Sequence, residues 1–176
     1  MRLAARLLSA CLFLVAACTG RPANLGGPVP DGEQVSRESN RLPASGFSVA
    51  WTRPQVPARL SLDQIVSIPV TLKNTSDRTW PDSTMADPSH SAAGAYSVRL
   101  SYRMSGTGGN ASQGSYDARV ELGRPLPPGE SVTLVILVKA PAERGKYQLQ
   151  FDLVQELYAW FADKGADRLL VPVEIR

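Results

Sequence analysis

The sequence contains a single histidine, His90, and two cysteines, Cys11 and Cys18. This scarcity leaves too few ligands for a zinc site, and a histidine-dependent catalytic triad would have to use His90. Ser89 and Ser91 flank His90, but adjacency in sequence does not place a base and a nucleophile within reach of each other. We therefore expect a protein that is not an enzyme and that uses no metal and no cofactor. A hydrolase built around His90 is the weaker alternative.

Runs of basic residues are also missing. The chain has 19 Lys+Arg against 16 Asp+Glu, and two of the arginines, Arg2 and Arg6, fall within the first 17 residues. The remainder is close to neutral, so nothing in it predicts a nucleic-acid partner, which requires a basic patch. Asp152, Glu156 and Asp163 come nearest to a glycosidase pair or a calcium site. Their spacing in an alternating segment instead predicts that Asp152 and Glu156 lie on the solvent-facing side of a strand.

The longest apolar run spans residues 7–17 and is too short for a membrane helix, which needs roughly 20 residues. Two arginines before it and small residues after it are typical of a secretory signal peptide, here over residues 1–17. The segment Leu14-Val15-Ala16-Ala17-Cys18 then resembles the lipobox of bacterial lipoproteins. An ordinary signal peptide that happens to contain a cysteine is the alternative.

This resemblance implies that Cys18 carries lipid and becomes the first residue of the mature chain. We then expect a protein anchored in the cell envelope, with the membrane as its first partner. Thr19 stands where inner-membrane lipoproteins of Gram-negative bacteria tend to carry aspartate. The resemblance therefore implies the outer membrane, facing the periplasm, if the organism has two membranes. Because Cys11 leaves with the signal peptide, no disulfide is expected within one mature chain.

Composition divides the mature chain in two. Residues 18–45 are rich in Gly, Pro, Ser and charged side chains, which predicts a disordered tether after the lipidated cysteine. Over residues 46–176, apolar and polar residues alternate with period two in several segments, which predicts strands. The clearest alternations fall at residues 66–73, 98–103, 132–138, 147–153 and 169–175, with weaker ones at 47–51, 116–122 and 158–161.

Turn clusters separate these segments, and no segment holds a sustained helical period. Seven or eight short strands of this kind predict an all-β fold, an antiparallel β-sandwich of the immunoglobulin or fibronectin-III type. Pro69 and Pro172 interrupt two of the strands and predict edge positions or bulges, because proline cannot donate to a ladder. Pro128-Gly129 predicts a tight turn, Asn74 a turn closed by its own side chain, and Tyr147 a tyrosine corner.

Several short motifs follow one another in the domain. They are Val70-Thr71-Leu72-Lys73-Asn74-Thr75, Arg78-Thr79-Trp80-Pro81, Pro128-Gly129-Glu130-Ser131-Val132, Gly145-Lys146-Tyr147, Phe151-Asp152-Leu153-Val154-Gln155-Glu156 and Val171-Pro172-Val173. Their order resembles the immunoglobulin-like modules found beside bacterial glycosyltransferases and other glycan-handling proteins. More distantly, it is similar to the four-tryptophan domain of autophagy receptors. The resemblance covers about residues 47–176 and implies a fold rather than an activity.

Aromatic residues near the strand ends are the candidate ligand-binding residues: Trp80, Tyr158, Trp160 and Phe161. We expect a non-catalytic module that binds a glycan, if these rings are exposed and roughly coplanar, or an envelope protein, if the surface holds an apolar patch with a polar rim. Trp80 is also a candidate for the core. The alternative function is a structural accessory lipoprotein that assembles by strand addition at an unpaired, proline-free sheet edge.

Overall fold

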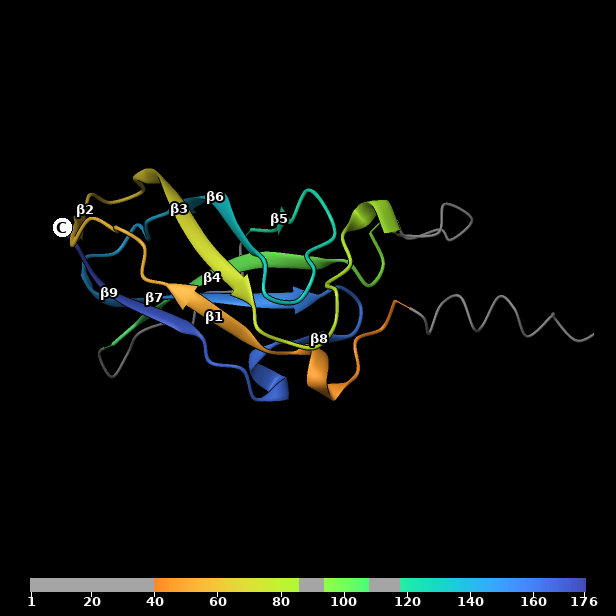
Figure 1. Ribbon diagram of the computed structural model, residues 1–176. Helices are drawn as coiled ribbons and strands as arrows, with labels where there is room; N and C mark the ends of the chain where they lie inside the picture. The colour runs from red at the N-terminus through yellow and green to blue at the C-terminus, as the bar shows by residue number, and fades with distance from the viewer. Residues whose placement is uncertain (1–39, 86–93, 108–117) are drawn as a thin grey trace, which may run out of the picture.

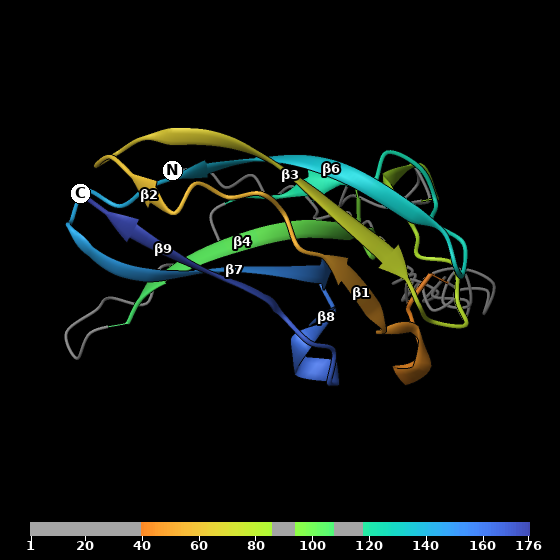
Figure 2. The ribbon, with the colours of Figure 1, turned by 60° about the vertical axis from the view of Figure 1, so that its left-hand side comes forward.

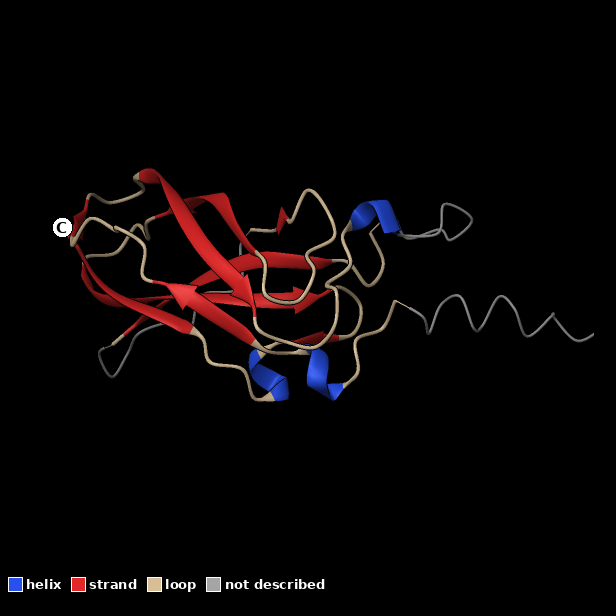
Figure 3. Cartoon of the chain, viewed as in Figure 1, coloured by secondary structure: helices blue, strands red, loops and turns tan. Residues whose placement is uncertain are grey.

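The computed structural model describes residues 40–85, 94–107 and 118–176, whose strands form two β-sheets (Figure 1, Figure 3). The all-β class is confirmed. The helices within the described ranges are three short 3-10 turns, η1 (Ala44–Gly46), η2 (Ser83–Met85) and η3 (Ala162–Lys164). No helix in these ranges is long and apolar enough to cross a membrane. The signal peptide, Cys18 and most of the expected tether lie outside the described residues.

The smaller sheet has the strand order β1-β3-β6. Its middle strand, β3 (Ile65–Asn74), pairs antiparallel with β1 (Val49–Thr52) over residues 71–74 and with β6 (Ser131–Lys139) over residues 65–73. Odd-numbered residues of β3 point outwards and even-numbered ones point inwards, as the period-two alternation predicts.

The larger sheet has the order β2-β9-β7-β4-β5, and a short strand, β8, pairs with β7. Its strands are β2 (Arg59–Leu60), β4 (Val98–Gly106), β5 (Val120–Glu121), β7 (Gly145–Gln155), β8 (Ala159–Trp160) and β9 (Leu169–Ile175). The sequence pattern predicts no strand at β2. It pairs parallel to β9, so this one pair departs from the expected antiparallel arrangement.

The two sheets form two layers, which Figure 2 shows with β3 and β6 above β4, β7 and β9. The hydrophobic core lies between the layers and is built from the inward residues of the predicted alternations. These are Ile68, Val70 and Leu72 of β3, Leu134, Ile136 and Val138 of β6, Val98, Leu100, Tyr102 and Met104 of β4, Leu149, Phe151 and Leu153 of β7, and Val171, Val173 and Ile175 of β9. This two-layer arrangement confirms the expected immunoglobulin-like sandwich.

Both strand prolines belong to strands that are internal to their sheets, but each lies at a local edge, where one side of the strand has no partner among the described residues. Pro69 faces Val135 of β6 but lies beyond the end of β1, whose partners are residues 71–74. Pro172 faces Gln148 of β7, while β2 reaches only residues 174 and 175 of β9. A missing N–H at these points removes no ladder hydrogen bond.

The turn predictions are also confirmed. The Tyr147 hydroxyl donates to the carbonyl of Glu143 at 3.0 Å, as in a tyrosine corner. The Asn74 side-chain oxygen accepts the N–H of Ser76 at 2.9 Å and so closes the turn after β3. In the turn at Pro128-Gly129 the glycine has a φ of +80°, a left-handed conformation that favours glycine.

Residues 40–45 pack against the sandwich, although composition predicts a boundary at residue 46. Leu42 is buried, and its N–H donates to the side chain of Gln155 at the end of β7. Residues 40–45 therefore belong to the folded unit and not to a tether. The burial of Leu42 and its hydrogen bond to Gln155 place these residues in the folded unit. Composition averaged over a segment rich in Gly, Pro and Ser shows neither feature.

Candidate functional site

Trp80 and Phe161, two of the four candidate ligand-binding aromatics, are core residues that offer no surface to a ligand. Each is 0% exposed, and their rings pack edge to face with centroids 5.1 Å apart. Trp80 and Leu126 each donate their backbone N–H to the carbonyl of the other, and the Trp80 side chain points inwards. Its indole Nε1 donates to the Gly46 carbonyl at 2.8 Å. The expectation of ligand contact is therefore wrong for both residues, and the core alternative for Trp80 is correct.

Tyr158 is half-buried, and cations lie over its ring. The Arg41 guanidinium carbon lies 4.0 Å from the ring centroid and the Lys164 ammonium nitrogen 4.9 Å from it. The ring packs on Phe47 at 6.0 Å, and Phe47 packs edge-on against Phe161 at 4.9 Å. These rings lead from the surface into the core, at steep angles to one another. They do not form the coplanar platform on which a sugar would stack.

Trp160 lies apart from the other three, opposite Val154 in the β7–β8 pair. It is half-buried, and the guanidinium carbon of Arg119 lies 4.7 Å from its ring centroid. The same guanidinium donates to the hydroxyl of Ser101 on β4 at 2.7 Å. Trp160 is thus packed beside polar and charged groups of the larger sheet.

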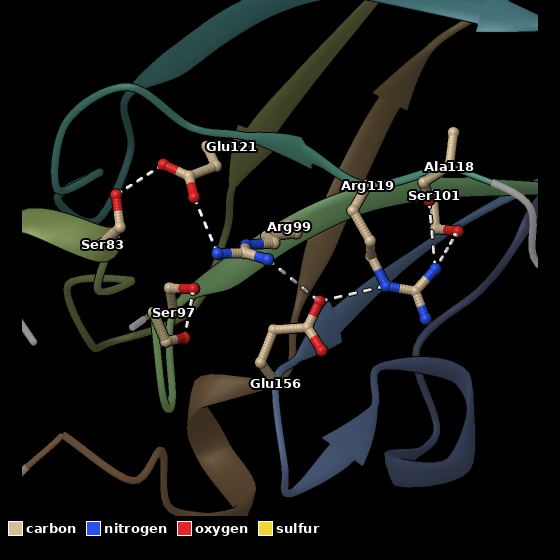
Figure 4. Close-up of polar contacts among 9 residues, drawn as sticks. Ser83, Ser97, Arg99, Ser101, Ala118, Arg119, Glu121 and Glu156 are labelled. Carbon is tan, nitrogen blue, oxygen red and sulfur yellow. Dashed lines mark hydrogen bonds and ion pairs between the residues drawn. The ribbon is translucent and has the colours of Figure 1, made fainter. Parts of the chain in front are cut away.

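Those groups form a charged network, in which Glu156 lies between two guanidinium groups (Figure 4). Arg119 Nε lies 3.0 Å from Glu156 and Arg99 lies 3.8 Å from it. Arg99 also bonds Glu121 at 2.7 Å, and the Ser83 hydroxyl donates to the other oxygen of Glu121. The network joins β4, β5, η2 and the end of β7. Each of its carboxylates is already engaged by an arginine, so its evident role is to fix these elements together.

Asp152 is buried, at 1% exposure, so its expected place on a solvent-facing side is wrong. Its Oδ1 accepts the N–H groups of Leu153 at 2.8 Å and Ala162 at 3.3 Å, and its Oδ2 accepts Arg168 Nε at 3.1 Å. The chain after β8 folds back over the end of β7, which is why the alternation fails there. Burial raises the pKa of Asp152, while the hydrogen bond and charge of Arg168 oppose that rise.

The three carboxylates singled out in the sequence are therefore structural. Asp163 is exposed and lies 3.8 Å from another nitrogen of Arg168, and Glu156 belongs to the network of Figure 4. Within the described ranges, no group of three or more His, Cys, Asp or Glu side chains could hold a metal ion. His90 and Cys18 lie outside the described residues.

A small pocket of about 180 Å³ lies where residues 40–43 meet residues 78–85. Two arginines, Arg41 and Arg78, line it together with Pro43, Pro81 and Met85. Pockets that bury small ligands usually have at least about 300 Å³. The pocket is therefore too small to be favoured as a ligand site.

The outer face of the smaller sheet is apolar at its centre. Ile65 is 63% exposed, Val135 56% and Leu137 61%. In the β3–β6 register Val135 faces Pro69 and Leu137 faces Ser67, with Ile65 two residues further along β3 on the same face. We call the group Ile65, Pro69, Val135 and Leu137 the β6 patch.

Polar groups border the β6 patch at both ends. At one end the hydroxyls of Thr71 and Thr133 are 2.8 Å apart across the β3–β6 pair. At the other end Lys139 Nζ lies 3.2 Å from the carboxylate of Asp63. The surface thus has the apolar centre and polar rim that are typical of a protein-binding site.

Strand β6 is also an open edge of its sheet. Among the described residues it pairs only with β3, and it contains no proline. Asn74 N–H donates to Glu130 at one end of the β3–β6 ladder, and Ala140 N–H donates to Gln64 at the other. Hydrogen-bonded and non-bonded pairs alternate along an antiparallel ladder. Even-numbered residues of β6 therefore bond to β3, and odd-numbered residues turn their N–H and C=O groups to the free edge.

One of those edge groups already has a partner. The Tyr102 hydroxyl, reaching across from β4, accepts the N–H of Lys139 at 3.0 Å. The edge that faces outwards is therefore the stretch from Ser131 to Leu137, with Thr133 and Val135 between them.

The sequence holds a signal for this surface that alternation alone does not capture. Residues 134–138 read Leu-Val-Ile-Leu-Val, an unbroken apolar run. The inward set identifies the strand, but the outward positions 135 and 137 are apolar as well. A run of this kind predicts a strand that is covered on both faces.

Comparison with known proteins assigns the chain to no family. No protein-family model matches the sequence, and no curated protein sequence matches it. Among solved structures, the CARDB domain of a Pyrococcus furiosus protein, in complex with di-metal ions, is similar at 12% identity and a TM-score of 0.43, over 73% of this chain and 88% of that chain.

Two enzymes contain a similar part. A β-glucosidase from Listeria innocua matches at 15% identity and a TM-score of 0.43, over 73% of this chain and 16% of that chain. The alkylpurine DNA glycosylase AlkC of Pseudomonas fluorescens, bound to DNA containing an abasic site analog, matches at 11% identity and a TM-score of 0.46, over 73% of this chain and 30% of that chain. The chain thus spans a small part of either enzyme, and likeness at this level says nothing about activity.

Proposed function

We propose that this protein is a lipid-anchored component of the bacterial cell envelope and that its β-sandwich is a non-catalytic module for binding a protein. The anchor is Cys18, and the docking surface is the β6 patch with the free edge of β6. The observation that supports this most is the exposure of Ile65, Val135 and Leu137, each more than half exposed on one face of one sheet. Single exposed apolar residues are ordinary, but a contiguous group inside a polar rim is typical of protein-docking surfaces.

Anchoring suits such a module. A lipid on Cys18 would confine the domain to the membrane surface, and Thr19 favours the periplasmic side of the outer membrane. Confinement raises the effective concentration of any partner in the same membrane, so a modest docking surface suffices. Replacing Cys18 with serine in the full chain should release the protein from the membrane fraction. Retention of Cys18→Ser in that fraction after signal cleavage would contradict the anchor.

Site-specific photo-crosslinking in intact bacterial cells tests the docking surface. A photoreactive side chain is placed in the full chain at Val135 or Leu137, and at Leu170 of β9 as a control that is 49% exposed on the other sheet. We expect an adduct of discrete mass from Val135 and Leu137 and none from Leu170. The substitution Thr133→Lys on the same face places a charge beside the β6 patch and should abolish the adduct. Folded protein that gives no adduct at either position would overturn the proposal.

A glycan site at Trp160 is the second candidate. It is favoured by the partly exposed indole beside Arg119, whose guanidinium carries hydrogen-bond donors for a sugar. The protein-binding proposal is preferred because Arg119 already lies over this ring and because Trp80 and Phe161 are buried. A single partly covered ring offers less stacking surface than a row of exposed rings.

A further inference from the structure

We infer that the partner of the β6 patch is a second copy of this chain, joined by antiparallel pairing of the two β6 strands about a twofold axis at Val135. The inference rests on the proposed function, since it names the partner of the same surface. Four observations carry it: the length of the open edge, the direction of its free backbone groups, its charge pattern and the position of the β6 patch.

The other strands at the sheet edges are short, whereas β6 is long. β1 has four residues, β2 has two and β5 has two, but β6 has nine. Proteins usually protect an exposed edge by keeping it short or by placing proline, a bulge or inward charges on it. Residues 131–138 of β6 carry no proline and no charge. An edge of this length and composition is suited to pairing with another strand.

The free backbone groups of β6 match those of a second β6. Because odd-numbered residues face the edge, Val135 can pair with Val135 of the second copy as a hydrogen-bonded pair. Thr133 then faces Leu137 of the other copy, and Ser131 faces Lys139. Thr133, Val135 and Leu137 of each copy donate one N–H bond and accept one at the carbonyl. Lys139 needs no new partner for its N–H, because Tyr102 already accepts it.

The side chains suit the same register. Lys139 is the one charged residue of β6, and this register sets it opposite Ser131, away from its own copy. Like charges directly opposite each other would destabilise the pair, and β-branched pairs such as Val135 with Val135 stabilise it. On the outer face the two β6 patches become continuous across the axis. Val135 and Leu137 then gain cover that they lack in one chain, where they are 56% and 61% exposed.

The pairing is closed, because it uses the same edge on both copies. A twofold interface of this kind is self-complementary and ends at a dimer. Growth through the far side of the same sheet would need a second long edge. That side has the four residues of β1 and, beyond them, a stretch of β3 that Pro69 interrupts.

Disulfide capture tests the pairing and its register. The full chain is produced in bacterial cells with Val135→Cys, and the cells are treated with a mild oxidant. Directly opposed residues of a hydrogen-bonded pair have Cα atoms about 5.5 Å apart, which lies within the range of about 4.4–6.8 Å that a disulfide spans. We expect a dimer that reducing agent separates. The unsubstituted chain, which carries Cys18, and Leu170→Cys on the other sheet should form no disulfide-linked dimer, as judged under denaturing, non-reducing conditions.

The register has its own control at Thr133. Thr133→Cys alone should give no disulfide-linked dimer, because Thr133 faces Leu137 of the other copy. Thr133→Cys together with Leu137→Cys should give one. A Thr133→Cys chain that dimerises as readily as Val135→Cys would overturn the stated register.

The outcomes also separate this inference from the proposed function. If the Val135→Cys chain has the same unfolding temperature as the unsubstituted chain but forms no intermolecular disulfide, the inferred dimer is wrong. If the photoreactive group at Val135 then captures a different protein, the docking surface stands with another partner. If the photoreactive group captures nothing, both the proposed docking surface and the inferred dimer are wrong.

Discussion

The backbone N–H of Leu42 donates to the side-chain oxygen of Gln155 at 3.0 Å, although 113 residues separate them in the sequence. The amide nitrogen of Gln155 donates in turn to the carbonyls of Asn40 at 2.7 Å and Tyr96 at 2.9 Å. Gln155 is 0% exposed, so these backbone groups are what satisfies its amide. A buried amide that loses its partners costs about 1–3 kcal/mol. The segment before β1 is thereby tied to the end of β7.

A chain that begins at residue 46 should therefore be less stable than one that begins at residue 40. We expect its free energy of unfolding in urea to be lower by about 2 kcal/mol, from the lost burial of Leu42 and the unsatisfied amide of Gln155. Leu42→Ala in the longer chain should reproduce most of this loss. Asn40→Ala should change little, because Gln155 bonds the backbone of Asn40 and the side chain of Asn40 makes only an exposed bond. Equal free energies of unfolding for the two chains would mean that residues 40–45 belong to the tether and not to the folded unit.

Substitution of the two tryptophans should have unequal effects on stability. Trp80→Ala removes a fully buried indole and its hydrogen bond to Gly46, so the free energy of unfolding should fall by about 3–5 kcal/mol. Trp160→Ala removes a half-buried ring and its contact with Arg119, which should cost about 1 kcal/mol. Urea unfolding followed by circular dichroism measures both. Similar losses for the two variants would mean that Trp80 is not the core residue described above.

Tryptophan fluorescence separates the two candidate functions. If the module binds a protein, titration with envelope glycans should give no saturable change in the emission of the chain. A saturable change that is lost in Trp160→Ala, and kept in the matched variant Tyr158→Phe, would establish a glycan site at Trp160. That result would replace the protein-binding proposal.

Asn74 should be the most sensitive polar residue of the turns. It is 0% exposed, and its amide nitrogen donates to the carbonyls of Arg78 at 2.7 Å and Leu126 at 2.8 Å. Its oxygen accepts both the N–H and the hydroxyl of Ser76. Asn74→Ala leaves these buried groups unpaired and should lower the free energy of unfolding by about 3 kcal/mol. Lys73→Ala next to it, on the exposed face, should change it by less than about 0.5 kcal/mol.

The fold was predictable where one physical signal decides the structure. Alternation located β3, β4, β6, β7 and β9, because each has one face in the core. Turn chemistry located Asn74 and Tyr147, because a side-chain amide and a tyrosine hydroxyl bond the nearby backbone. The strand β2 was not predictable in the same way, since two residues carry no period and pair with β9 only through contacts distant in sequence.

The candidate site was less predictable, because exposure depends on what the rest of the chain covers. In the sequence Trp80 is a candidate for the core or for ligand binding and Phe161 is a ligand-binding candidate, and the bridge to Leu126 and the turn after β8 bury both. Asp152 follows the alternation of β7 but is covered by the segment that carries Ala162 and Arg168. Conversely, Val135 and Leu137 lie in an apolar run that looks like core and are exposed, because no described strand covers that face.

The pH dependence of stability gives a direct test of the Asp152 environment. Because burial raises its pKa, the folded state holds this proton more tightly than the unfolded state does. The resulting stability is fully present below the unfolded pKa of about 3.9 and is lost as the pH rises through the higher pKa of the folded state. Asp152→Asn does not titrate, and its side-chain oxygen can still accept the N–H groups of Leu153 and Ala162. The stability of the wild type relative to Asp152→Asn should therefore fall as the pH rises above the unfolded pKa of about 3.9.

Comparison of the two chains cancels the titration of the groups that they share. The control is Asp163→Asn, whose side chain is 61% exposed and lies farther from Arg168; it keeps Asp152 and so separates an effect of Asp152 from one common to any Asp→Asn substitution beside Arg168. Urea unfolding at a series of pH values measures both differences. A wild type that gains stability relative to Asp152→Asn as the pH rises would show that the ion pair with Arg168 outweighs burial. Asp152 would then be a carboxylate that stabilises the fold by its charge, and the segment after β8 would be held mainly by that charge.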